Sequence, residues 1–284
     1  MNVTQEKAYG KLNLTLDVLS RREDGYHDMK MIMQTVDLCD DITVTLGTEE
    51  RSCTCDIANI PADSSNLAYR AAELFLSRWG RPQDGFSIHI QKRIPMQGGM
   101  AGGSADAAAV LRAMNRLSDN AFSMDELMEM ALQLGSDVPF CLMGGTALAE
   151  GRGEILTKLP PMPACYIVLL KPEFSVSTPR LFAQLDDKGI KDHPNTDSAL
   201  MALEGSDLPR LCQHMENVFE PVLSAEYPII SALREELLRH GALSARLTGT
   251  GSVVFGIFDH YASANEAYLH FTQKGIQAFF TKPV

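Results

Sequence analysis

The sequence lacks an apolar run near the roughly 18 residues that a membrane-spanning helix requires. Residues 1–11 are polar and do not form the apolar core of a signal peptide. Basic residues are also fewer than acidic ones. The sequence has 25 Lys and Arg and 36 Asp and Glu, which gives a net charge of −11. That balance disfavours wide, sequence-independent contact with nucleic acid. We therefore expect a cytoplasmic chain that binds neither a membrane nor nucleic acid, with a locally cationic pocket for any anionic ligand.

Paired CxxC motifs are absent as well. The six cysteines stand at positions 39, 53, 55, 141, 165 and 212, mostly inside apolar or strand-like stretches. Cys53 and Cys55 would face the same side of a strand, but the second pair that a zinc site normally has is missing. We interpret the cysteines as structural thiols, and the sequence assigns no metal ligand.

The spacing of apolar residues predicts a mixture of strands and helices. Strands are predicted at 8–19, 31–38, 42–46, 86–90, 165–170, 242–247, 253–258 and 276–281. Helices are predicted at 66–79, 105–117, 124–134, 179–185, 199–203, 229–240 and 261–274. Prolines at 160, 161 and 163 break any regular element. The length and the 45% hydrophobic content favour two lobes. The pattern predicts an α+β fold with domains at 1–159 and 160–284.

Two polar residues on the first predicted strand and one acidic residue after a predicted helix are candidate site residues. In the strand 8–19, Lys11 and Asn13 alternate with leucines and so share the polar face. Asp137 follows Gly135, which stands where a left-handed cap would end the helix 124–134. Taken alone, a strand lysine is usually a solvated surface residue, and an aspartate after a helix usually forms a turn.

The most informative stretch is a glycine-rich loop between a predicted strand and an alanine-rich helix. Its glycines at 98, 99, 102 and 103 allow backbone N–H groups to approach phosphate oxygens closely, and the start of the following helix favours negative charge. Ser104 can cap that helix or help to hold a metal-bound phosphate. The simpler alternative is a flexible loop. The GxxxxGK[ST] lysine of a P-loop is missing, and the spacing is not that of a Rossmann GxGxxG motif.

This loop resembles the second motif of the GHMP kinases, the superfamily of galactokinase, homoserine kinase, mevalonate kinase and phosphomevalonate kinase. Three further segments are similar to the branch that phosphorylates 4-diphosphocytidyl-2-C-methyl-D-erythritol. They are Ala8-Tyr-Gly-Lys-Leu-Asn-Leu14 with Asp24-Gly-Tyr-His27, Leu134-Gly-Ser-Asp-Val-Pro-Phe140, and Arg246-Leu-Thr-Gly-Thr-Gly-Ser252. The four segments occur in the family's order over nearly the whole chain.

The resemblance implies a two-lobed fold, with an N-terminal lobe like domain 2 of ribosomal protein S5 and a ferredoxin-like C-terminal lobe. It implies ATP with Mg²⁺, a cytidine diphosphate polyol phosphorylated on its 2-hydroxyl, and a monomer or weak homodimer. Lys11 and Asp137 would form the catalytic pair. The substrate would contact Asn13, Tyr26, His27, Thr178 and Phe182. ATP would contact Pro95, Met96, Gln97, Gly98, Gly99, Met100, Ala101, Gly102, Gly103, Ser104 and Ala105, with Asn66 and Lys92 near the adenine.

Other interpretations remain open at this point. A homoserine or mevalonate kinase of the same superfamily would keep the ATP loop but lack the cytidine-binding set, and a non-catalytic member would bind metabolites without needing Lys11 and Asp137. Without the family motifs, Tyr26 would be part of a hairpin turn and Phe182 a core aromatic. The loop also departs from the usual pattern at Ala101, where glycine is common and a methyl group resists positive φ.

Overall fold

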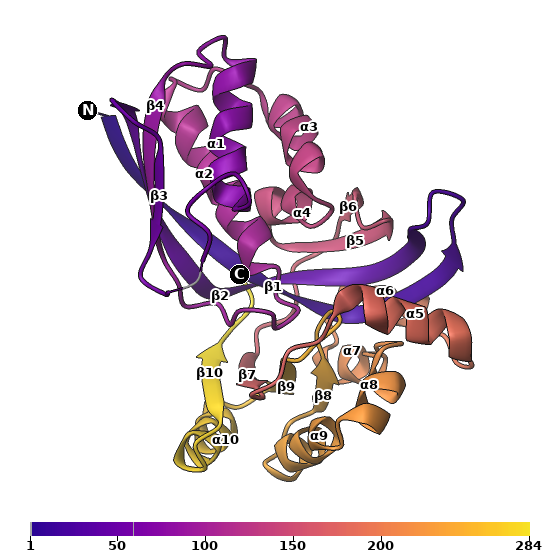
Figure 1. Ribbon diagram of the computed structural model, residues 1–284. Coiled ribbons are helices and arrows are strands. Elements are labelled where there is room, and N and C mark those ends of the chain that lie inside the picture. Colours follow the sequence, from indigo (N-terminus) through magenta and orange to yellow (C-terminus); the bar gives the residue numbers. More distant parts are fainter. Residues whose placement is uncertain (1, 59) are drawn as a thin grey trace. The chain divides into compact units, whose positions relative to one another are not determined.

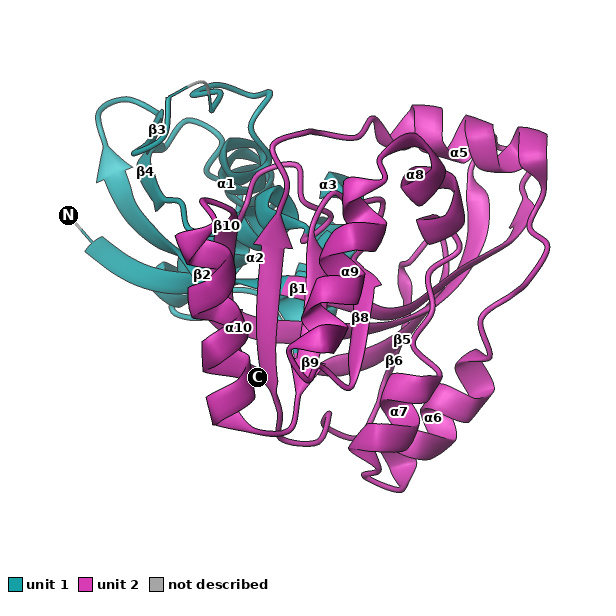
Figure 2. Ribbon diagram, turned by 90° about the horizontal axis from the view of Figure 1, so that it is seen from below, with its two compact units in different colours: residues 1–10, 39–94, 101–144 teal, residues 11–38, 95–100, 145–284 magenta. Residues whose placement is uncertain are grey.

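Two long strands, β1 (Asn2–Arg21) and β2 (His27–Thr48), pair with each other in the computed structural model, which describes residues 2–58 and 60–284 (Figure 1). The chain divides into two compact units (Figure 2). Unit 1 comprises residues 1–10, 39–94 and 101–144, and unit 2 comprises residues 11–38, 95–100 and 145–284. The α+β prediction is confirmed, whereas the domain boundary between residues 159 and 160 stays a prediction.

Unit 1 consists of strands and a layer of helices. The second half of β2 pairs antiparallel with β4 (Gly85–Gln91), which pairs parallel with β3 (Ser52–Cys55). The helices pack on one another, and α1 also contacts β3 and β4. They are α1 (Leu67–Arg78), α2 (Gly102–Leu117), α3 (Met124–Leu134) and α4 (Val138–Met143). The alanines at 105, 107, 108 and 109 are buried, which lets α2 approach its neighbours closely.

Unit 2 contains part of the sheet described above and a second, separate sheet. The first half of β2 pairs antiparallel with β5 (Thr146–Gly151), and β5 pairs with β6 (Ile155–Lys158). A separate four-stranded antiparallel sheet has the order β10 (Gln277–Thr281), β7 (Tyr166–Lys171), β9 (Val254–Phe258), β8 (Ser244–Leu247). The helices are α5 (Thr178–Lys188), α6 (Thr196–Glu204), α7 (Leu208–Gln213), α8 (Glu220–Glu226), α9 (Ile229–Arg239) and α10 (Tyr261–Gln273). Figure 2 shows α9 and α10 over one face of this sheet.

Three local expectations were wrong. Helix α2 begins at Gly102, so Ser104 lies inside its first turn and does not cap it. Gly135 has a φ of 169°, which is extended backbone and not the predicted left-handed cap; the chain straightens there before α4 begins at Val138. Two strands were predicted across residues 31–46, but β2 is one continuous strand that pairs with one neighbour through residues 29–34 and with another through residues 41–48.

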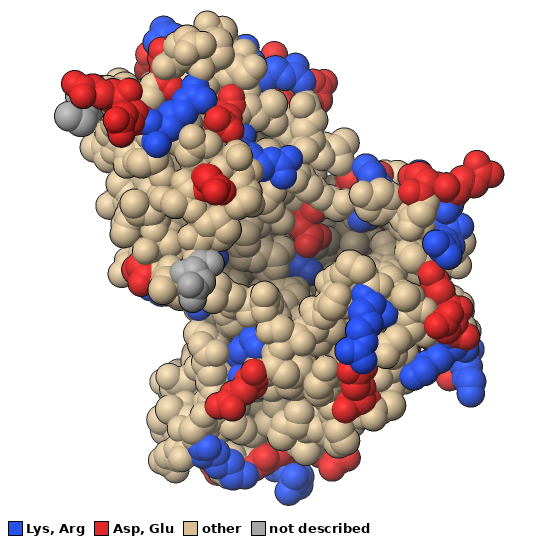
Figure 3. All heavy atoms as spheres, in the orientation of Figure 1, with Lys and Arg blue, Asp and Glu red and all other residues tan. Residues whose placement is uncertain are grey.

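The surface carries both signs of charge. On the face shown in Figure 3, Lys and Arg side chains are interspersed with Asp and Glu side chains and do not gather by sign. No helix among the described residues is both long and apolar enough to cross a membrane.

Candidate active site

Two glycine-rich segments of unit 2 pack backbone against backbone. The N–H of Val253 donates to the carbonyl of Gly98 at 3.2 Å, beside the turn that joins β8 to β9. A Cβ atom on Gly99, whose φ is +78°, would lie 2.2 Å from the carbonyl oxygen of Thr248. A Cβ atom on Gly98 would lie 2.7 Å from a methyl group of Val253. Both positions therefore need glycine, because any side chain would push the loop away from the turn.

Strand β1 adds Lys11 and Asn13 to this arrangement. The N–H of Lys11 donates to the carbonyl of Met100 at 3.2 Å, and the N–H of Asn13 donates to the Thr248 hydroxyl at 3.1 Å. The Lys11 ammonium donates to the Asn13 Oδ1 at 2.6 Å. The prediction of a shared face is thus confirmed, but that face is buried: Lys11 is 5% and Asn13 1% exposed. A buried ammonium with one amide oxygen as its described partner is suited to an anionic ligand.

Helix α5 begins beside the same turn. The Thr178 hydroxyl forms a hydrogen bond of 2.9 Å with the Thr250 hydroxyl, which lies between Gly249 and Gly251. Thr178 was predicted next to the substrate, and its neighbour here is the glycine turn. Unit 2 therefore brings together the strand pair Lys11 and Asn13, the loop residues 98–100, the 248–251 turn and Thr178. We call this set the unit 2 cradle.

An aromatic group lies elsewhere in unit 2. The rings of His27 and Phe182 stack with centroids 4.7 Å apart, and the His27 Nε2 is 2.8 Å from a carboxylate oxygen of Asp186. Tyr26 is 56% exposed and lies in the predicted hairpin turn, with the Arg152 guanidinium 5.0 Å from its ring centre. A cavity of about 240 Å³ is lined by His27 and Asp186. An exposed ring, a stacked pair and a polar imidazole edge are the features that bind a flat heterocycle.

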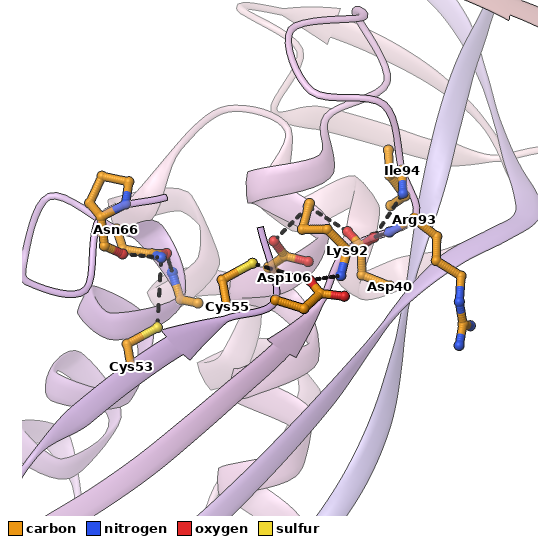
Figure 4. Close-up of polar contacts among 11 residues, drawn as sticks. Asp40, Cys53, Cys55, Asn66, Lys92, Arg93, Ile94 and Asp106 are labelled. Atoms are coloured by element: carbon orange, nitrogen blue, oxygen red, sulfur yellow. Dashed lines mark hydrogen bonds and ion pairs between the residues drawn. The ribbon is translucent and has the colours of Figure 1, made fainter. Parts of the chain in front are cut away.

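In unit 1, Lys92 lies under the first turn of α2. Its ammonium is 2.5 Å from an oxygen of Asp40 and 2.9 Å from an oxygen of Asp106, and all three side chains are at most 5% exposed. Figure 4 shows the lysine pointing toward both carboxylates. Burial lowers the pKa of Lys92, but the charges of Asp106 and Asp40 outweigh it and raise the pKa overall. Burial raises the pKa of Asp106. A Cβ atom on Gly102 would lie 3.1 Å from the Lys92 Nζ, so the glycine permits this approach.

The remaining predicted residues of unit 1 lie at helix starts. Ala101 precedes α2 with a φ of 56°, the left-handed conformation that its methyl group disfavours, and α2 has no side-chain cap. Its first-turn N–H groups are of the kind that binds anions. Asp137 is half-buried at the start of α4 and makes no capping bond. Asn66 caps α1 by accepting from the N–H of Ala68 at 2.9 Å, as its simpler interpretation predicted.

Sequence reasoning missed several polar partners. Thr248 and Thr250 flank Gly249 in a motif that was noticed, so their position was within reach of the pattern. Asp186, Asp40 and Asp106 carried no signal, because each acts through a residue far away in the sequence. Lys11 and the 98–100 segment belong to unit 2, whereas Asp137 and residues 101–105 belong to unit 1.

Comparisons with known proteins identify the family. Residues 66–145 match the GHMP kinases N terminal domain, and residues 199–277 match the GHMP kinases C terminal domain. The chain belongs to the GHMP kinase family. It is therefore a phosphotransferase that uses ATP, and the predicted two-lobed GHMP fold is confirmed.

Individual GHMP kinases refine the comparison. A 4-diphosphocytidyl-2-C-methyl-D-erythritol kinase from Caldicellulosiruptor saccharolyticus is 47% identical over 92% of this chain and 90% of its own length. A crystal structure of 4-(cytidine 5'-diphospho)-2C-methyl-D-erythritol kinase superposes with a TM-score of 0.84 at 30% identity, covering 99% of both chains. A homoserine kinase from Cytophaga hutchinsonii has a TM-score of 0.78 at 18% identity, covers all of this chain and 95% of its own, and shares the fold alone. The predicted branch is confirmed, and the homoserine alternative is not favoured.

Proposed function

We propose that this GHMP kinase transfers the γ-phosphoryl group of ATP to the 2-hydroxyl of 4-diphosphocytidyl-2-C-methyl-D-erythritol. The observation that carries the proposal is the unit 2 cradle, in which the backbone of Lys11 and Asn13 bonds the glycine loop and Thr248 while the buried Lys11 ammonium bonds an amide oxygen. Backbone N–H groups and a buried cation favour the charged oxygens of phosphates. The names of the relatives supply the identity of the acceptor alcohol.

The reaction requires one bond to form and one to break. The substrate hydroxyl oxygen bonds to the γ-phosphorus while the bond to the β,γ-bridging oxygen breaks, and ADP leaves. We assign Asp137 as the group that accepts the hydroxyl proton, since a carboxylate performs this task in other phosphotransferases. Lys11 orients the hydroxyl and offsets the charge on the transferred phosphoryl. Asn13 holds the Lys11 ammonium through its amide oxygen, 2.6 Å away.

The nucleotide is proposed to lie along residues 95–105. The first-turn N–H groups of α2 and the hydroxyl of Ser104 face no competing side-chain cap. Asn66 and Lys92 were expected near the adenine. The amide of Asn66 already bonds Ala68 and Pro61, and Lys92 already bonds two carboxylates, so we propose that both support the pocket from behind.

Magnesium would arrive as the metal complex of ATP. The stretch 95–105 contains no Asp or Glu, and its oxygen donors are the Ser104 hydroxyl, the Gln97 amide oxygen and backbone carbonyls. This fits an ion that keeps most of its ligands from phosphate and water. When bound, Mg²⁺ neutralises charge on the phosphate oxygens.

Selection of the cytidine substrate is assigned to the aromatic group. We expect Tyr26 and Phe182 to stack on the cytosine and the His27 imidazole to hydrogen-bond its edge; since Phe182 is stacked on His27, cytosine must either use the other face of Phe182 or displace that contact. Asp186 fixes the orientation of that imidazole. Homoserine and mevalonate have no ring for this group to hold. We also propose that the protein is cytoplasmic and that it is a monomer or a weak homodimer.

The test is steady-state ATP consumption with three alcohols: the cytidine diphosphate substrate, homoserine and mevalonate. We expect turnover with the first alone, and Lys11→Ala should lower kcat by roughly 10²–10⁴-fold. Equal turnover with homoserine or mevalonate would refute the substrate assignment. Unchanged turnover in Lys11→Ala would remove the lysine from the mechanism while leaving the substrate assignment intact.

A further inference from the structure

A cluster of two histidines and one glutamate lies in unit 2, and the kinase reaction does not use it. Glu236 is on α9, and His240 follows one turn later, so the spacing of four residues puts both side chains on one face. His270 is on α10. The two helices cover the same face of the four-stranded sheet, as Figure 2 shows. The cluster therefore joins two helices that are separated in the sequence by the strands β8 and β9.

The donor atoms lie close enough for one ion. The ligand atoms of Glu236, His240 and His270 all lie within 4.8 Å of one another. The His270 Nε2 is 2.6 Å from the Glu236 Oε1, and the two imidazole rings have centroids 4.3 Å apart. Zinc bonds nitrogen and carboxylate oxygen at about 2.0–2.2 Å, so tetrahedral donors lie about 3.3 Å apart. To hold an ion, the widest separation must close from 4.8 Å toward that value, and the His270–Glu236 contact must open from 2.6 Å.

The donor types select the kind of ion. Two imidazole nitrogens and one carboxylate oxygen suit zinc and its transition-metal neighbours, whereas magnesium and calcium prefer oxygen alone. All three residues are half-buried, so an ion has access from solvent.

We propose that Glu236, His240 and His270 form a binding site for a divalent transition-metal ion, with zinc as the probe, that clips α9 to α10. The Lys274 ammonium contacts the Glu236 Oε1 and competes with the ion for it. Since α9 and α10 support the sheet that carries the glycine turn, the clip stabilises unit 2. Water completes the coordination, because the three side chains leave at least one position open.

The experiment uses the full chain without a histidine tag, stripped with EDTA and titrated with zinc by calorimetry. We expect one zinc per chain, and a rise of several degrees in Tm when free zinc is about 100 times Kd. His270→Asn and Glu236→Gln should each weaken binding at least about tenfold. Lys274→Met should tighten it, since the competing cation is gone.

The matched control is His260→Asn, whose side chain is 80% exposed in the same unit, outside the cluster. It should bind zinc like the wild type, and MgATP-dependent activity of His270→Asn without zinc should be unchanged. The proposal is overturned if the wild type shows no saturable zinc binding, or if His270→Asn binds as tightly as the wild type. It is equally overturned if the double change Cys53→Ser, Cys55→Ser abolishes the binding.

Discussion

Replacing Gly99 by alanine should disable the unit 2 cradle, and the structure offers a matched control. Gly275 has a φ of +76° against +78° for Gly99, but a Cβ atom on Gly275 meets nothing within 4 Å. Both substitutions carry the cost of about 1–2 kcal/mol that a side chain has at positive φ. Only Gly99→Ala adds a contact of 2.2 Å with the Thr248 carbonyl oxygen, where real Cβ contacts begin near 3.0 Å.

The extra contact forces the loop and the turn apart by about 0.8 Å. Two hydrogen bonds cross that contact, from Val253 N to Gly98 O at 3.2 Å and from the Thr248 hydroxyl to Gly99 O at 3.4 Å. Their loss adds about 0.5–1.5 kcal/mol each, so Gly99→Ala should lower the free energy of unfolding by about 2–5 kcal/mol. A displacement near 1 Å also costs about 100-fold in rate. We expect kcat/KM for ATP to fall by about that factor.

Urea unfolding and an assay of ADP release with the cytidine substrate check both numbers. Gly275→Ala should lose about 1–2 kcal/mol and keep kcat/KM within about threefold. If Gly99→Ala behaves like Gly275→Ala in both assays, the packing of the loop on the turn does not position the phosphates, and the reasoning fails.

Three further predictions concern single side chains. Asp137→Asn should lower kcat by roughly 10²–10⁴-fold while the Kd for ATP, measured by calorimetry, stays close to normal; wild-type turnover would exclude Asp137 as the proton acceptor. Tyr26→Ala should raise the KM for the cytidine substrate and not for ATP, whereas Tyr261→Ala, an equally exposed tyrosine at 57%, should change neither; a raised KM for ATP would move Tyr26 to the nucleotide site. Burial raises the pKa of Asp106 from 3.8 to about 7. Between pH 3.8 and about 7 the Asp106 carboxyl is therefore protonated in the folded state and ionised in the unfolded state, so the folded state loses stability as pH rises through that range. Denaturant unfolding at pH 4.5 and 7.5 should therefore show the wild type losing stability relative to Asp106→Asn, and parallel curves would contradict the assignment.

Periodicity was sufficient for elements whose pattern is local. Helix α3 was predicted at its observed bounds, because its pattern of apolar residues is local; the structure adds that Ser123 caps it. The shared face of Lys11 and Asn13 also followed from alternation alone. The alternation did not predict that this face is buried, because its burial depends on the glycine loop and the turn that cover it.

The features that the sequence did not predict depend on tertiary contacts. Lys92 reads as an ordinary residue at a strand end, yet its partners are 52 and 14 residues away, and no local pattern connects them. Gly135 was expected in a left-handed cap because glycine usually ends a helix so, but the chain has to extend there to start α4. The metal-type cluster likewise joins residues from two helices whose adjacency only the fold creates.

The central claim is tested most directly by the phosphorus NMR spectrum of the product. In 4-diphosphocytidyl-2-C-methyl-D-erythritol the 2-carbon carries a methyl group and no hydrogen, whereas the carbons of the other free hydroxyls carry hydrogen. Incubation with ATP should give a new phosphomonoester signal that is not split by a proton on its own carbon, together with ADP. A split signal would move the phosphoryl to another hydroxyl, and no new signal, with ATP intact, would contradict the proposed function.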